Sequence, residues 1–185
     1  ANNPLASLLP KSRIFITFAL ANHFLSFSNM EVINLCKHDS LLSRYMLELR
    51  DKDIQTDRLR FRTNVKRIGQ IMAYEISKRL EYADQQTTTP LGLASTRTIA
   101  DKVVLGSIFR AGLPLHEGFL SFFDYAENAF ISAYRKYIEG SNDFVIRTEY
   151  LASPSIEGKV LVIADPMLAT GGSMDVAIRA FLQKG

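Results

Sequence analysis

The sequence predicts an α/β fold in which helices flank a parallel sheet and a β-hairpin arm projects from that sheet. The apolar runs 103–109 and 160–164 are each followed by a loop with small residues and then by a helical pattern. Continuous apolar runs of this length are typical of strands that are buried on both faces of a parallel sheet. Two further strand-like runs, 129–134 and 144–146, are separated by a turn-rich cluster and predict the arm.

Residues 1–29 differ in composition from the rest of the chain. They contain no acidic residue and include the apolar stretch 14–21. A secretory signal and a transit peptide both have such features, but we favour the interpretation that Met30 is the true start and that upstream sequence precedes it. The stretch is too short to span a bilayer, which needs ~20 residues. We therefore expect residues 1–29 to lie outside the core and residues 30–185 to form the functional domain.

A long amphipathic helix is predicted after Thr56, which can cap its N-terminus. Apolar residues recur there every three or four positions and mark one buried face. The opposite, basic face is interpreted as solvated surface, and a role in building a dimer is the alternative. The polar stretch 85–92 that follows predicts a loop or an edge hairpin. The apolar positions are Phe61, Val65, Ile68, Met72, Ile76 and Leu80, and the basic ones are Arg58, Arg62, Lys66 and Arg67.

The strand predicted at 103–109 ends in Arg110, Ala111 and Gly112. In an open α/β sheet, ligands bind outside the carboxyl ends of the strands, so Arg110 is expected at a binding crevice. A guanidinium matches phosphate oxygens in a bidentate way. His116 lies in the helical pattern that follows but has no partner in the sequence, and we interpret it as structural.

The strand predicted at 160–164 leads into a second loop of the same kind. Asp165 stands where the strand ends, and the small residues 169–173 precede a helical pattern over 174–184. Glycines let backbone N–H groups approach an anion, hydroxyl groups add donors, and the helix dipole favours negative charge. The loop is thus predicted to bind a phosphate group. Asp165 is placed to accept hydrogen bonds from hydroxyls of the phosphate's carrier, which indicates a sugar phosphate.

Composition narrows the class of protein. A chain of 185 residues suits one domain with a substantial core, and a net charge of +3 suits an anionic substrate. The sequence has no dense basic stripe interleaved with aromatic residues, which would be the signature of nucleic-acid binding. The single cysteine, Cys36, excludes an internal disulfide and fits a reducing compartment, so a cytoplasmic protein is expected. The three histidines lack the spacing of zinc ligands, and we expect no metal held by the protein and no membrane partner.

The loop after the second strand resembles the 5-phosphoribosyl-1-pyrophosphate (PRPP) signature of type I phosphoribosyltransferases, whose fold is Rossmann-like. The residues of this loop are similar to those of the uracil phosphoribosyltransferase branch of the family. Pro166 stands where most type I members carry a second acid, so Asp165 is expected to contact the ribose alone. The residues that the resemblance assigns to PRPP binding are Asp165, Pro166, Met167, Leu168, Ala169, Thr170, Gly171, Gly172 and Ser173.

The resemblance also implies a reaction and its catalytic residues. Uracil would react with PRPP to give UMP and pyrophosphate, with Mg²⁺ carried by PRPP rather than by the protein. Arg110 and Arg135 are similar to the two arginines that contact the pyrophosphate, so Asp165, Arg110 and Arg135 are the expected catalytic residues. The match at Arg135 departs from the family over 136–138, where many members are acidic. The family is usually a homodimer or a higher homo-oligomer.

The resemblance covers residues 30–185 and implies a C-terminally incomplete member. Family members continue past the corresponding helix into further strands and a glycine-rich segment that holds the base. Two alternatives to the uracil enzyme therefore stay open. One is a non-catalytic PRPP-binding or regulatory protein that has lost the base site, and the other is a type I transferase for a different base.

Overall fold

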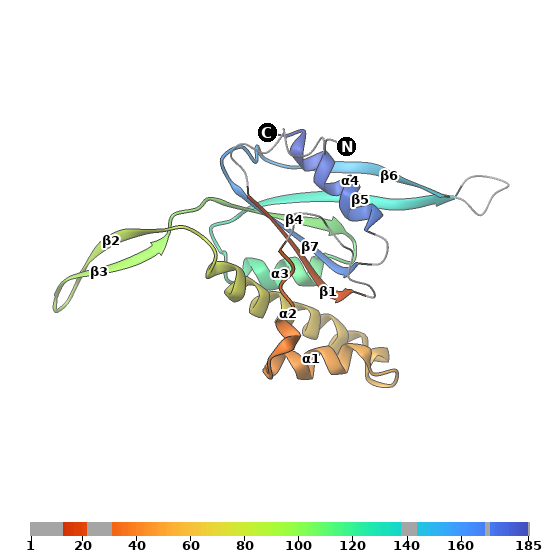
Figure 1. Cartoon of the computed structure of the whole chain (residues 1–185), viewed down its shortest axis with the longest axis horizontal. Coiled ribbons are helices and arrows are strands. Elements are labelled where there is room, and N and C mark those ends of the chain that lie inside the picture. Colours follow the sequence, from red (N-terminus) through yellow and green to blue (C-terminus); the bar gives the residue numbers. More distant parts are fainter. Residues whose placement is uncertain (1–12, 22–30, 138–143, 169–170, 185) are drawn as a thin grey trace.

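A computed structural model describes residues 13–21, 31–137, 144–168 and 171–184. Its central sheet has five strands in the order β1-β7-β4-β5-β6 (Figure 1). Neighbouring strands are parallel from β1 to β5, and β6 is antiparallel to β5. The predicted α/β fold with a mostly parallel sheet is confirmed. The strands are β1 (Arg13–Ala21), β4 (Val103–Phe109), β5 (Glu127–Tyr137), β6 (Phe144–Ala152) and β7 (Val160–Leu168).

Helices cover both faces of the sheet. In Figure 1, α1, α2 and α3 lie below the strands and α4 lies above them. Two separate hydrophobic cores result, because side chains of a strand alternate between its faces. On β4, for example, Leu105 contributes to the core of α1–α3 and Val104 to the core of α4. The helices are α1 (Leu41–Arg50), α2 (Arg58–Ser77), α3 (Leu113–Leu120) and α4 (Gly172–Leu182), with short 3₁₀ turns at Leu35–Lys37 and Ile54–Thr56.

The predicted long helix is α2, and its N-terminal cap differs from the expectation. Asp57 rather than Thr56 is the cap, and its Oδ1 accepts hydrogen bonds from the N–H groups of Leu59 and Arg60, both at 3.0 Å. A carboxylate at this position also favours the positive end of the helix dipole. The apolar face packs into the core as predicted, with Val65 and Ile68 buried.

Helices α2 and α3 cross at two glycines. A Cβ built on Gly118 would lie 2.2 Å from the carbonyl oxygen of Lys66 and 2.9 Å from the Cα of Gly69. A Cβ on Gly69 would lie 2.5 Å from the carbonyl oxygen of Leu115. No side chain fits between the two backbones here, so the helices approach each other through glycine alone. This contact fixes α3 beneath the end of β4.

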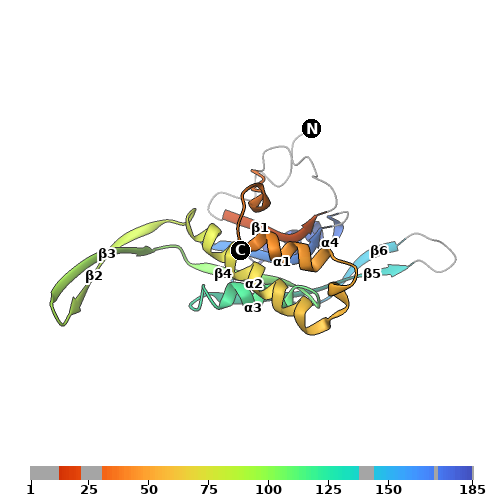
Figure 2. The ribbon, with the colours of Figure 1, turned by 90° about the horizontal axis from the view of Figure 1, so that it is seen from below.

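Two hairpins project from opposite ends of the molecule (Figure 2). One consists of β5 and β6 and is the arm that the sequence predicts. The other consists of β2 (Tyr82–Thr89) and β3 (Gly92–Ile99), so the polar stretch 85–92 belongs to a hairpin. Every residue of β3 is exposed, and Gly92, with a φ of 128°, turns the chain at the tip.

Part of the predicted leader forms an element of the sheet, which differs from the expectation for residues 1–29. Strand β1 pairs in parallel with β7, from Arg13 opposite Val160 to Ala21 opposite Leu168. Apolar residues on both of its faces explain this position, since Phe15 packs towards α1–α3 while Ile14 and Ile16 pack towards α4. Among the described residues, no helix is long and apolar enough to cross a membrane.

Candidate functional site

The two strands that lead into the predicted loops end at one edge of the sheet. Strands β4 and β7 are parallel neighbours, so their carboxyl ends lie side by side. Gly112, in the turn after β4, packs against this pair of strands. A Cβ built on it would lie 2.6 Å from the Oγ of Ser107 and 2.7 Å from the carbonyl oxygen of Ala164. Only a residue without a side chain lets the turn lie this close to β7.

Arg110 occupies the turn between β4 and α3, which we call the arginine turn (residues 110–112). The Phe109–Arg110 peptide bond is cis, and the side chain of Arg110 is exposed at the sheet edge. Gly112 is the N-cap of α3 and offers no capping side chain, but Pro114 has no N–H and the N–H of Leu113 donates to the carbonyl oxygen of Arg110 at 3.4 Å. The guanidinium of Arg110 is therefore the group of this turn that is suited to an anion with several oxygens, such as pyrophosphate.

Asp165 lies near the carboxyl end of β7. Its Oδ1 accepts a hydrogen bond from the N–H of Met167 at 3.2 Å, and the side chain is partly buried. Burial raises the pKa of this carboxyl, and the bond from Met167 lowers it by a smaller amount. The next residues alternate in exposure, because Pro166 and Leu168 are buried whereas Met167 is 53% exposed.

The N-terminus of α4 follows this strand. Gly171 is its N-cap, with a left-handed φ of 79° that favours glycine. Gly171 offers no capping side chain, so the amide groups of the first turn are available to a phosphate. Ser173 is partly buried in that first turn. Ala169 and Thr170, also predicted to bind the phosphate, lie outside the described residues.

Arg135 is placed by the backbone of the arm. It lies opposite Ile146 of β6 and three positions beyond Ser132, where the pairing of β4 with β5 ends. The arm therefore leaves the sheet at the edge where Arg110 lies. The side chain of Arg135 is outside the described part of the structure.

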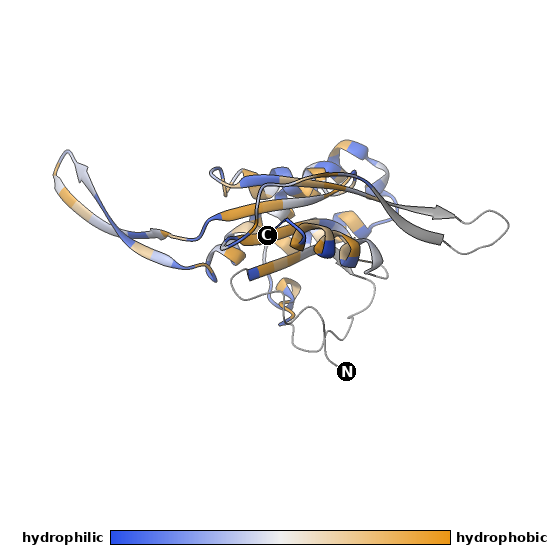
Figure 3. Cartoon of the chain, turned by 90° about the horizontal axis from the view of Figure 1, so that it is seen from above, coloured by the Kyte–Doolittle hydropathy of each residue, from blue (hydrophilic) through white to orange (hydrophobic). Residues whose placement is uncertain are grey.

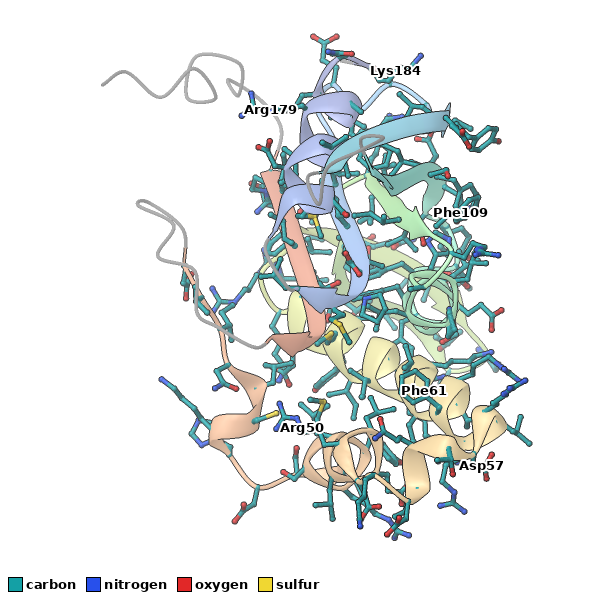
Figure 4. The ribbon with its side chains drawn as sticks, turned by 90° about the vertical axis from the view of Figure 1, so that its right-hand side faces the viewer. Arg50, Asp57, Phe61, Phe109, Arg179 and Lys184 are labelled. Carbon is teal, nitrogen blue, oxygen red and sulfur yellow. The ribbon has the colours of Figure 1, made fainter. Side chains whose placement is uncertain are left out.

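Aromatic residues beside the arginine turn are a feature that the sequence analysis missed. The ring of Phe109 stacks on those of Phe130 and Tyr150, at centroid distances of 5.0 Å and 6.3 Å. Figure 4 shows Phe109 at the end of its strand. The available signal was an aromatic residue next to Arg110 and others in the two arm strands, but their contact depends on strand register.

His116 is buried, as its structural interpretation implies. It is 4% exposed, and its Nε2 lies 2.8 Å from the Oδ1 of Asn128 on β5. Burial lowers the pKa of this histidine, which favours the neutral ring. A neutral ring that donates from Nε2 leaves Nδ1 as an acceptor, and Nδ1 has no hydrogen-bond partner among the described residues.

Comparison with known sequences decides the family. The sequence model of uracil phosphoribosyltransferases matches residues 36–185. The chain belongs to the uracil phosphoribosyltransferase family. A uracil phosphoribosyltransferase from Porphyromonas gingivalis is 58% identical over 156 residues, which are 84% of this chain and 72% of that protein. One from Pyrobaculum arsenaticum is 39% identical over 150 residues, 80% of this chain and 70% of that protein.

A solved structure is similar in fold to this chain. It is described as the structure of the AQ2163 protein from Aquifex aeolicus and is 30% identical, with a TM-score of 0.62. The similarity covers 68% of this chain and 59% of that chain. The predicted family and fold class are therefore confirmed.

The described part of the chain contains no group of three or more His, Cys, Asp or Glu side chains that could hold a metal ion.

Proposed function

We propose that this chain transfers the 5-phosphoribosyl group of PRPP to uracil, giving UMP and pyrophosphate in pyrimidine salvage. The observation that carries the proposal is that β4 and β7, each followed by the N-terminus of a helix, end at the same edge of the sheet. One loop has Arg110 at the N-terminus of α3, and the other has Gly171 at the N-terminus of α4. A substrate with a phosphate at one end and a pyrophosphate at the other fits this pair, and family membership supports the same substrate.

Each loop has a distinct role in the proposed complex. Residues 169–173 and the N-terminus of α4 bind the 5-phosphate, and Asp165 accepts hydrogen bonds from the ribose hydroxyls. Residues 166–168 shape the loop between them. Arg110 and Arg135 bind the pyrophosphate, Arg110 from the turn and Arg135 from the arm. Their charges stabilise the negative charge that develops on the leaving group.

The chemistry proposed for this site needs no covalent intermediate with the protein. The bond from C1 of the ribose to a pyrophosphate oxygen breaks, a bond from C1 to N1 of uracil forms, and the proton of N1 passes to the leaving pyrophosphate or to water. The transition state resembles an oxocarbenium ion, as in other displacements at an anomeric carbon. Catalysis then rests on alignment of the reactants and on stabilisation of pyrophosphate. Mg²⁺ enters as part of the substrate, chelated by the phosphates of PRPP.

The test is to titrate the chain with Mg²⁺-PRPP by calorimetry and to assay UMP formation from uracil and PRPP. Binding together with UMP formation supports the proposal. Saturable binding without UMP formation favours the alternative of a non-catalytic PRPP-binding protein. Absence of PRPP binding contradicts both, because both depend on the same two loops.

Replacing Asp165 with asparagine is expected to weaken PRPP binding by about tenfold or more, since a hydrogen bond to a charged acceptor contributes about 1.5–3 kcal/mol. The fold should become more stable at neutral pH. Burial raises the pKa of Asp165, so the folded protein holds this proton more tightly than the unfolded chain does. The contribution of this carboxyl to stability therefore falls as the pH rises from its pKa in the unfolded chain to its raised pKa in the folded protein.

The asparagine variant lacks this titration, so its advantage in melting temperature should grow as the pH rises above the ordinary pKa of an aspartate, about 4, and level off above the raised pKa of the folded protein. Calorimetric titration and thermal melts measure the two effects. Unchanged PRPP affinity would remove Asp165 from the ribose role. Asp53→Asn is the matched control, because that carboxylate is exposed in the segment between α1 and α2.

We further propose that the chain works as a homodimer or a higher homo-oligomer. The β2–β3 hairpin supports this proposal, because an isolated two-stranded hairpin is marginally stable in water. Its tip exposes Leu91 fully and Leu93 to 78%. Figure 3 shows apolar positions (orange) along this hairpin, away from the body of the molecule.

Cys36 is exposed and free, which supports the reducing cytoplasm as the proposed location.

Replacing both Leu91 and Leu93 with serine is expected to shift the protein towards monomer, because these side chains lose apolar area to bury in a partner. Light scattering after size-exclusion chromatography measures the molar mass. The paired control replaces Gln85 and Gln86 with alanine on β2 of the same hairpin. An unchanged oligomer in the serine variant would exclude the hairpin tip from the contact.

A further inference from the structure

Four rings surround the arginine turn and form a cluster that we call the aromatic clasp: Phe109, His116, Phe130 and Tyr150. The ring of Phe130 lies 5.0 Å from that of Phe109 and 5.0 Å from that of His116. The rings of Phe109 and Tyr150 are nearly parallel, with 4° between their planes. These distances and orientations are those of favourable aromatic pairs.

The clasp holds both ends of the arginine turn on one strand of the arm. Phe109 immediately precedes the turn, and His116 follows it within α3, where its N–H donates to the carbonyl of Gly112 at 2.9 Å. Phe130 of β5 contacts both rings. Asn128, also on β5, lies 2.8 Å from the His116 ring. A shift of β5 at this position would therefore move both ends of the turn.

The second arm strand joins the clasp where the arm bends. Ser132 pairs with Tyr150, but Ala133 pairs with Thr148, so Glu149 is an extra residue and forms a bulge. Bulges bend a strand and re-aim the residues beyond it. Tyr150 thus stacks on Phe109 directly beside the point where the arm that carries Arg135 changes direction.

Core packing does not account for this arrangement. Phe109 and Phe130 are only partly buried, and Tyr150 is 50% exposed. None of these three rings belongs to either hydrophobic core of the described structure. Their contacts connect the arginine turn to the arm instead.

We propose that the aromatic clasp couples the arm to the arginine turn, so that Tyr150 is a positioning residue for the two pyrophosphate arginines, Arg110 and Arg135. The inference rests on the proposed function, because it concerns the pyrophosphate end of the same site. Tyr150 acts through Phe109 and β6 and does not itself contact the substrate.

The test compares Tyr150→Ala, which removes the ring, with Tyr150→Phe, which keeps it. We expect the alanine variant to bind Mg²⁺-pyrophosphate about tenfold more weakly than the wild type, and the phenylalanine variant to bind within about twofold of it. Tyr125→Ala is the matched control, because Tyr125 is 97% exposed on the turn before β5. Equal affinity of Tyr150→Ala and wild type would overturn the proposal.

A double-mutant cycle with Arg135→Ala separates coupling from general destabilisation. Because Tyr150 positions both arginines, its removal should weaken pyrophosphate binding less once Arg135 is absent than it does in the wild type, and the remaining loss reflects Arg110. Additive losses would overturn the coupling. A wild-type chain that binds neither pyrophosphate nor PRPP would contradict the proposed function. A wild type that binds both, with additive variants, would contradict only the role of the clasp.

Discussion

An Arg110→Ala variant is expected to lose about 10²–10³-fold in kcat/KM for PRPP, the range seen when one donor to a developing anion is removed. Arg110 is exposed in the turn after β4, so its removal leaves no cavity in either core. The melting temperature should therefore stay close to that of the wild type. The loss comes from the leaving group, because a guanidinium binds two phosphate oxygens at once.

Arg110→Lys tests this geometric explanation, since lysine keeps the charge but lacks the planar fork. We expect an intermediate kcat/KM, as steady-state assays at varied PRPP would measure. Arg50→Ala is the matched control, because Arg50 is exposed on α1, at a distance from Phe109 (Figure 4). A full loss in Arg110→Ala that lysine restores completely would contradict the bidentate contact. No loss in either variant would remove Arg110 from the site.

Replacing Gly118 with alanine is expected to lower the free energy of unfolding by about 3 kcal/mol, at the upper end of the range for overpacked interiors. The added Cβ would lie 2.2 Å from the carbonyl oxygen of Lys66, and both groups belong to helix backbones that cannot move independently. Helices α2 and α3 must separate to admit it. For a chain of this size, this loss corresponds to a fall in melting temperature of about 6–12 °C.

Gly158→Ala is the comparison for this stability effect. A Cβ there meets no atom within 4 Å, and its only penalty is the left-handed φ of 67°. We expect a smaller loss, about 1–2 kcal/mol. Urea unfolding curves for both variants measure the difference. Similar losses at the two positions would show that backbone conformation rather than helix contact explains the Gly118 effect.

Periodicity and turn chemistry predicted the elements that hold the site. The buried runs that form β4 and β7 are continuous and apolar, and this pattern is typical of strands buried on both faces of a sheet. Arg110 and Asp165 follow these runs directly, so the parallel sheet alone brings them to one edge. The arm was predicted from two strand patterns around a turn. Local sequence is sufficient for features of this kind because the spacing of residues along the chain fixes them.

Features that depend on tertiary register were not predictable in this way. Nothing local in residues 14–21 distinguishes an apolar leader from an edge strand. Only the pairing with β7 shows that these residues form a strand of the sheet. The contact between Phe109 and Tyr150 depends on a bulge in the partner strand. The glycine contact between α2 and α3 joins residues 49 positions apart, from 69 to 118, which no pattern within one helix reveals.

The separation of the two hydrophobic cores has a consequence for how this molecule can change over evolution. Leu115 and Phe119 anchor α3 in one core, and Ala177 and Phe181 anchor α4 in the other. Substitutions that lie far apart without shared partners act nearly additively. In the proposed complex, substitutions in the layer of α3 can therefore change affinity for the leaving group, while binding of the 5-phosphate by the layer of α4 stays the same.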